Sequence, residues 1–77
     1  MAHYFFHCSG GQEVVVDHHG DDVENLTEAR DRAFRVASWL ATTPGAQDWR
    51  TWTVHVSNDD GVEVLQVPFS LVLGRVH

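Results

Sequence analysis

The 77-residue chain contains no lysine, no isoleucine, a single cysteine and only two prolines. One cysteine, Cys8, cannot form a disulfide within the chain, which excludes the disulfide-stapled scaffolds of small secreted proteins. Five arginines against 11 acidic residues give a net charge of −6, which disfavours nucleic acids and anionic membrane surfaces as partners. Apolar runs fall far short of the about 20 residues of a membrane-spanning helix, so we expect no membrane segment.

The N-terminal residues lack the basic and apolar regions of a signal peptide, and we therefore expect a cytoplasmic protein. Twelve valines beside no isoleucine, and arginine in place of lysine, are typical of a GC-rich genome and predict a bacterial source. A chain of this length forms one domain, residues 1–77. Its apolar burial barely offsets the entropy of ordering the chain, which favours self-association.

Two strands are predicted within the first 18 residues. Residues 2–8 and 12–18 are rich in aromatic residues and valine, which favours strands. Gly10-Gly11 predicts the hairpin turn between them, because glycine adopts positive φ without steric cost.

A helix is predicted over residues 26–42. Asn25 and Glu28 form a capping box at its start, and Pro44-Gly45 ends it. Apolar residues recur at helical spacing along one side, which predicts the face that packs on the sheet. This stripe consists of Leu26, Ala29, Ala33, Val36, Ala37 and Leu40.

The C-terminal third predicts a second hairpin. Residues 51–57 alternate between apolar and polar, and Asn58-Asp59-Asp60-Gly61 predicts a turn into a strand over residues 62–67. Residues 69–74 form an apolar tail, expected to be a short turn or helix. The predicted fold is α+β: a two-layer ββαββ arrangement, with a four-stranded, mainly antiparallel sheet and the helix on one face.

Several short motifs occur here in one order. These are Tyr4-Phe5-Phe6-His7, Asp17-x-x-Gly20, the helix that follows Asn25-Leu26, Trp52-x-Val54-x-Val56, and Asp59-Asp60-Gly61. In this order the chain resembles domain of unknown function family 6894, a set of small, mostly alphaproteobacterial proteins. The resemblance covers nearly the whole chain and implies a single bacterial domain. It implies no activity and no catalytic residues.

Six histidines in so short a chain are the main candidates for a site. A turn at Gly10-Gly11 places His3 opposite His18, with His7 and His55 on the same helix-free face. Cβ atoms on adjacent strands are about 5 Å apart, close enough for two zinc ligands. His3 and His18 are therefore candidate zinc ligands. The alternative is that these histidines are solvated and that no cofactor is bound.

The first hairpin is apolar on both faces, although a sheet covered on one side alternates. The second apolar set needs a cover, which a second copy of the chain supplies. The predicted homodimer interface consists of Phe5, His7, Val14, Val16 and His55. The alternative cover is the tail at residues 69–73.

The chain shows no combination of nucleophile, base and orienting residue, and Cys8 has the parity of the apolar face, which favours core packing. We therefore expect no enzyme, but a protein-interaction module that acts as a homodimer. One alternative is a metal-binding or pH-responsive protein, because protonating six histidines would change the charge from −6 to zero (−6 + 6 = 0). Another is an antitoxin-like partner of a basic protein.

Overall fold

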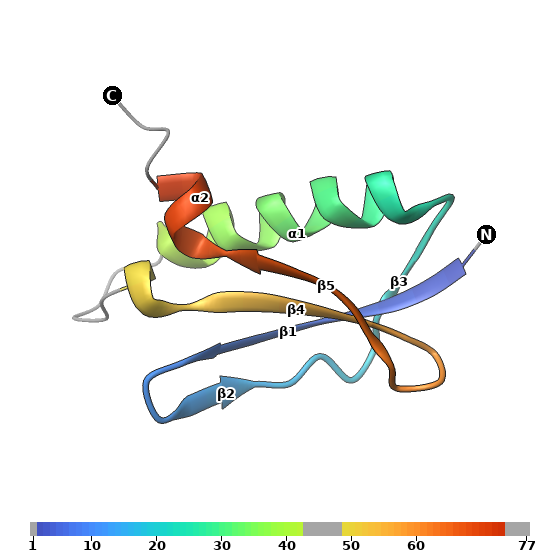
Figure 1. Ribbon diagram of the computed structural model, residues 1–77, viewed down its shortest axis with the longest axis horizontal. Helices are drawn as coiled ribbons and strands as arrows, with labels where there is room; N and C mark the ends of the chain where they lie inside the picture. The colour runs from blue at the N-terminus through green and yellow to red at the C-terminus, as the bar shows by residue number, and fades with distance from the viewer. Residues whose placement is uncertain (1, 43–48, 74–77) are drawn as a thin grey trace.

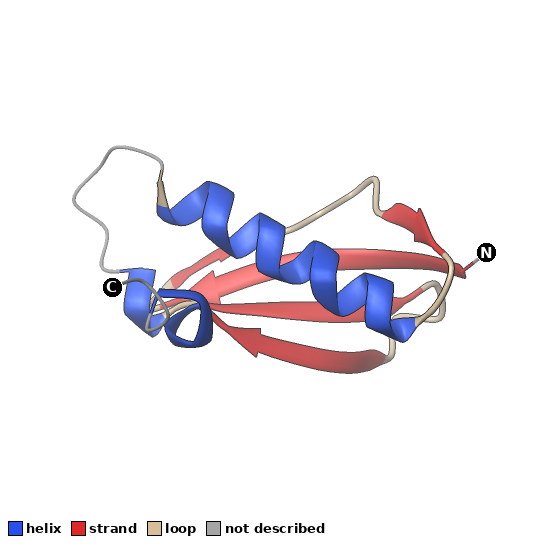
Figure 2. Cartoon of the chain, turned by 90° about the horizontal axis from the view of Figure 1, so that it is seen from above, coloured by secondary structure: helices blue, strands red, loops and turns tan. Residues whose placement is uncertain are grey.

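The computed structural model describes residues 2–42 and 49–73. A sheet in the order β2-β1-β4-β5, with β3 also paired to β1, forms one layer, and all pairings are antiparallel. The long helix α1 lies across one face (Figures 1 and 2). The predicted two-layer α+β architecture is therefore confirmed. The elements are β1 (Ala2–Gly10), β2 (Glu13–Val15), β3 (Asp21–Val23), α1 (Leu26–Ala41), the 3-10 turn η1 (Trp49–Thr51), β4 (Thr53–Asn58), β5 (Glu63–Pro68) and α2 (Phe69–Leu73).

The second predicted strand is interrupted. β2 pairs with the end of β1 at Cys8↔Val15, and β3 pairs with its beginning at His3↔Asp22. Because β4 occupies the other edge of β1, β2 and β3 lie along the same edge, and residues 16–20 loop out between them. The prediction of one strand over residues 12–18 is therefore wrong beyond Val15.

The first hairpin turns one residue later than predicted. Gly10 is still in β1 and pairs with Glu13, and Gly11 adopts a φ of +59° in the turn. A Cβ atom at Gly10 would overlap the Trp52 indole, so glycine is required there by packing rather than by the turn. This shift and the loop at residues 16–20 together place His3 opposite Asp22, and the predicted pairing of His3 with His18 is wrong.

Helix α1 matches its predicted span, and Asn25 caps it by accepting a hydrogen bond from the Glu28 amide at 2.9 Å. Pro44 and Gly45, the predicted stop, lie outside the described residues. Contact with the sheet runs through three fully buried alanines, Ala29, Ala33 and Ala37. Leu26, predicted to be in the core, is 45% exposed. The row of buried alanines is spaced by four residues, so it leads back to Asn25 rather than to Leu26. Val36 and Leu40 flank the core.

The second hairpin forms at the predicted turn. The Asn58 side chain accepts hydrogen bonds from the amides of Asp60 and Val62, and Gly61 adopts a φ of +82°. The buried residues Val54, Val56 and Val67 face α1. After β5 the chain forms α2, which packs against α1 and η1 on the helix side of the sheet (Figure 1). The alternative that residues 69–73 cover the opposite face is therefore wrong; Gly74 lies outside the described residues.

Candidate functional site

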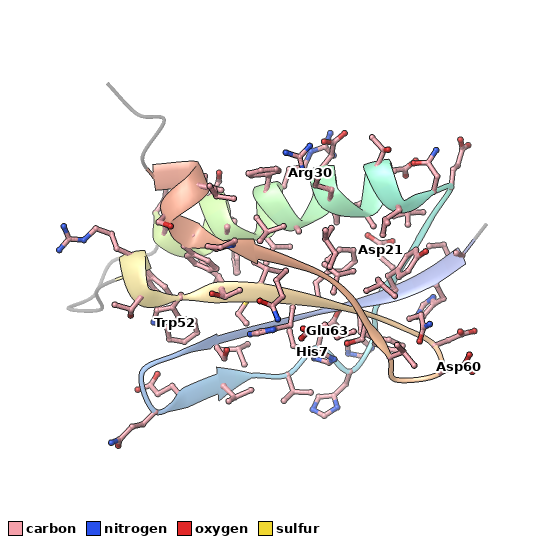
Figure 3. All side chains as sticks on the ribbon, in the orientation of Figure 1. His7, Asp21, Arg30, Trp52, Asp60 and Glu63 are labelled. Carbon is pink, nitrogen blue, oxygen red and sulfur yellow. The ribbon has the colours of Figure 1, made fainter. Side chains whose placement is uncertain are left out.

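The face of the sheet away from α1, called the open face below, gathers most of the candidate residues. Figure 3 shows His7 and Glu63 on this side, whereas Asp21 points toward α1 and bonds Arg32 at 2.7 Å. Strand register places His3, His7 and His55 on one face, as predicted. The open face includes His3, Phe5, His7 and Ser9 from β1, Val14 from β2, Asp22 from β3, Thr53, His55 and Ser57 from β4, and Glu63 and Gln66 from β5.

The hydrogen bonds of His3 favour its cationic form. Its Nδ1 atom lies 2.7 Å from the Asp22 carboxylate and its Nε2 atom 2.8 Å from the carbonyl oxygen of His19. Both partners only accept hydrogen bonds, so both ring nitrogens must carry protons to satisfy them. The Asp22 bond, aided by the His19 bond, raises the pKa of His3. The stability that this clamp contributes is present in acid and is lost as the pH rises through the raised pKa.

His7 has the opposite requirement at its Nδ1 atom. The backbone amide of Asp17 donates a hydrogen bond to this atom at 3.0 Å. An amide N–H can only donate, so Nδ1 must hold a lone pair, and the proton of the neutral ring lies on Nε2. The His7 ring also stacks on Phe5, with centroids 6.2 Å apart and an interplanar angle of 2°. His7 therefore presents an N–H donor on the open face.

The Asp17 side chain anchors the loop between β2 and β3. One carboxylate oxygen accepts a hydrogen bond from the Phe6 amide at 3.1 Å, where the neighbouring strand is missing. The other accepts hydrogen bonds from the amides of His19 and Gly20 at 3.1 and 3.0 Å. Burial pushes the pKa of Asp17 upward, but these three amide bonds outweigh it, and the net pKa is lowered. Ionised Asp17 therefore substitutes for the missing strand hydrogen bond.

Ser9, His55 and Glu63 form a continuous hydrogen-bonded relay. His55 Nδ1 lies 2.7 Å from Glu63 Oε1, and His55 Nε2 lies 2.8 Å from the Ser9 hydroxyl. Gln66 donates to the second oxygen of Glu63 at 2.5 Å, and this bond together with that from His55 lowers the pKa of Glu63. Because the ionised carboxylate only accepts, His55 carries its proton on Nδ1. In the neutral ring, Nε2 then accepts a hydrogen bond from the Ser9 hydroxyl.

A β-bulge brings Glu63 into this relay. His55 pairs with Gln66 and Val56 with Leu65, but Ser57 pairs with Glu63 because the register shifts between Val56 and Ser57. An unshifted strand would place Val64 opposite Ser57. The bulge therefore exchanges an apolar side chain for a carboxylate on the open face, a common use of bulges beside functional groups.

The predicted zinc ligands do not come together. His18 lies in the exposed loop after β2, whereas His3 is bonded to Asp22 and His19 through both ring nitrogens. A metal-bound imidazole must offer a nitrogen lone pair to the metal. Both ring nitrogens of His3 face hydrogen-bond acceptors, and the Nδ1 lone pair of His7 already accepts from the Asp17 amide. Among residues 2–42 and 49–73, no group of three or more histidine, cysteine or acidic side chains is arranged to hold a metal ion.

Cys8 lies in the core, as its parity predicted. Only 1% of its surface is exposed, and burial raises the pKa of its thiol to about 11. At neutral pH this side chain is a protonated thiol that packs among apolar neighbours. It is not an activated nucleophile.

Residues 3–70 match the family described as Domain of unknown function (DUF6894). The chain belongs to this family. In this DUF6894 protein the match includes the relay residues Ser9, His55 and Glu63, and also His3, His7 and Asp17. No curated protein and no solved structure matches the chain. In the part of the chain that the structure describes, no helix has the length and apolarity needed to cross a bilayer.

The relay of this DUF6894 protein is the part of the site that sequence reasoning missed. Ser9 lies between the two predicted strands, directly before the glycines that predict the turn, and Glu63 reaches the open face only through the bulge. The one available signal was the parity of His55, which opposes that of Val54 and Val56 and placed a histidine on an otherwise solvated face.

Proposed function

We propose that this protein is a cytoplasmic bacterial interaction module that forms a homodimer through strand β2. The supporting observation is a run of three exposed valines at this edge: Val14 is 66% exposed, and Val15 and Val16 are each 49% exposed. Burying a valine contributes roughly 1.5–3 kcal/mol, so covering part of this run provides a substantial driving force. Val14 and Val16 belong to the interface expected from the sequence.

The two outer edges of the sheet differ in their protection against pairing. β5 carries a bulge, the charged residue Glu63 at its start and Pro68 at its end, which are features that discourage edge-to-edge association. β2 is only three residues long and also begins with a charged residue, Glu13, but it carries no bulge and no proline, and its two valines are exposed. An exposed apolar edge without a bulge is suited to strand addition.

A second copy of β2 is the partner that fits this edge best. Two identical strands can pair antiparallel about a two-fold axis and satisfy both edges at once. Pairing at the edge leaves the open face accessible. There, His7 and His55 already bond within the chain, so they need no partner from another subunit. Self-association also supplies stability that a chain of 77 residues gains only with difficulty from its own core.

Sedimentation velocity at micromolar concentration tests this proposal. We expect the natural chain to sediment at twice its 8.7 kDa mass, and the double variant V14E/V16E to sediment as a monomer with unchanged circular dichroism. The matched control is V62E, because Val62 is 56% exposed but lies in the β4–β5 turn. A natural chain that sediments at 8.7 kDa overturns the homodimer, and so does a V62E variant that dissociates as readily as V14E/V16E.

A further inference from the structure

We propose that Ser9 is an activated nucleophile that takes the acyl group from small carboxylic esters. The proposal rests on the relay of Ser9, His55 and Glu63 and is independent of dimer formation. A serine hydroxyl attacks carbonyl carbon only when a base removes its proton, and a neutral imidazole oriented by a carboxylate is the usual base.

The first requirement is a base with its lone pair on the serine. The Ser9 oxygen lies 2.8 Å from His55 Nε2, within the range in which a proton is transferred directly. His55 is less than one-third exposed, with 27% of its side chain accessible, and Ser9 is also partly buried, so the hydrogen bond between them is partly shielded from water. β1 and β4 hold the two residues on paired strands, which positions them more firmly than a loop would.

The second requirement is an acceptor that holds the base in the correct tautomer. Glu63 Oε1 lies 2.7 Å from His55 Nδ1, and Gln66 donates to the other carboxylate oxygen. Gln66 is also the direct cross-strand neighbour of His55. Glu63 and Gln66 are positioning residues: they act on Ser9 only through the orientation and the proton of His55.

The third requirement is a donor for the negative charge that develops on the carbonyl oxygen. His7 lies directly across from His55 in the sheet and two residues before Ser9 on the same face of β1. The Asp17 amide fixes the His7 lone pair on Nδ1, which leaves the Nε2 proton to donate. We assign this imidazole N–H as the hydrogen-bond donor for the oxyanion.

The reaction balances with an ester and water alone. Ser9 Oγ bonds to the carbonyl carbon while His55 Nε2 takes the hydroxyl proton. The bond from this carbon to the leaving oxygen then breaks, and His55 returns the proton to the departing alcohol. Water attacks the resulting acyl-serine and gives its proton to His55, which passes it back to Ser9 as the carboxylic acid leaves. The Phe5 ring, which stacks on His7, is the apolar contact that we assign to the acyl group.

Acylation of the full-length chain by p-nitrophenyl acetate tests the proposal. We expect one acetyl group per chain, found on Ser9 by peptide mapping of the natural sequence, together with a burst of nitrophenolate. S9A should abolish this burst, and H55Q should slow it about 100-fold, the contribution of one general base. S57A is the matched control, since Ser57 lies on the same face of β4, and its acylation should equal that of the natural chain.

Glu63→Gln separates a positioning role from a structural one. We expect slower acylation with unchanged circular dichroism and a change in the nitrogen chemical shifts of His55, because an amide no longer requires the proton on Nδ1. The proposal is overturned if the natural chain acquires no acetyl group, if mapping finds the group on histidine or on another serine, or if S9A reacts as fast as S57A. Peptide mapping of the natural chain requires no variant to fold.

Discussion

Replacing Phe69 with alanine is expected to destabilise the fold by about 3–5 kcal/mol, the usual cost of removing a buried phenylalanine. Phe69 is completely buried, and its ring stacks on Trp49 at 5.9 Å and packs against Trp52 at 6.2 Å. Its amide also donates to the Trp52 carbonyl at 2.8 Å, which fixes the start of α2 over the end of the sheet. Small domains have total stabilities on the order of 5 kcal/mol, so F69A should leave a large unfolded population.

Leu71→Ala is the matched control for F69A. Leu71 lies two residues further along α2, and 52% of its surface is exposed. Its replacement should change the free energy of unfolding by less than about 0.5 kcal/mol, as at other exposed positions. Urea titrations of both variants, followed by tryptophan fluorescence, make the comparison. Equal midpoints for F69A and L71A would show that α2 does not cover the aromatic cluster.

Asp17→Ala is expected to cost about 3 kcal/mol, the value of one to two hydrogen bonds to a charged group after water replaces part of the loss. The variant leaves the amides of Phe6, His19 and Gly20 without their carboxylate acceptor. Gly20 has a φ of +68° and lies so close to His3 and the Tyr4 carbonyl that a Cβ atom there would be 2.5 and 2.7 Å from them. The loop therefore has little room to find new hydrogen bonds.

The acid dependence of D17A gives a second readout. The pKa of Asp17 is lowered by folding, so its contribution is present above the ordinary value of an aspartate and is lost as the pH falls through the lowered pKa. D17A should therefore lose less stability than the natural chain on acidification. Asp60→Ala, in the exposed β4–β5 turn, is the control and should retain natural stability. Thermal unfolding at neutral and acidic pH makes both comparisons, and equal behaviour of D17A and D60A would contradict the role of Asp17.

Local signals predicted the elements whose causes are local. Helix α1 follows from the Asn25 cap and helical periodicity, and the second hairpin follows from the turn that begins at Asn58. The predicted register of the first hairpin was wrong because it depends on a distant residue. Trp52 occupies the space beside Gly10 and keeps that glycine in the strand. The break after Val15 depends on Asp17, whose carboxylate bonds the Phe6 amide 11 positions earlier in the chain.

Residue parity predicted which histidines share a face but not what they do there. His3, His7 and His55 were placed together correctly, yet their hydrogen-bond partners come from a loop, a backbone amide and a bulge. None of these follows from strand alternation. The predicted pairing of His3 with His18 was wrong for the same reason, since the loop at residues 16–20 removes His18 from the strand beside β1. The relay requires three residues from three strands and a shifted register.

We expect the three histidines of the open face to hold their protons in three different arrangements. Nitrogen-15 spectra of the imidazole rings, recorded as a function of pH, distinguish these arrangements. We predict that neutral His7 carries its proton on Nε2 and neutral His55 on Nδ1, and that His3 stays doubly protonated to a higher pH than a free histidine. His55 with its proton on Nε2, or His3 titrating as a free histidine, would contradict the account.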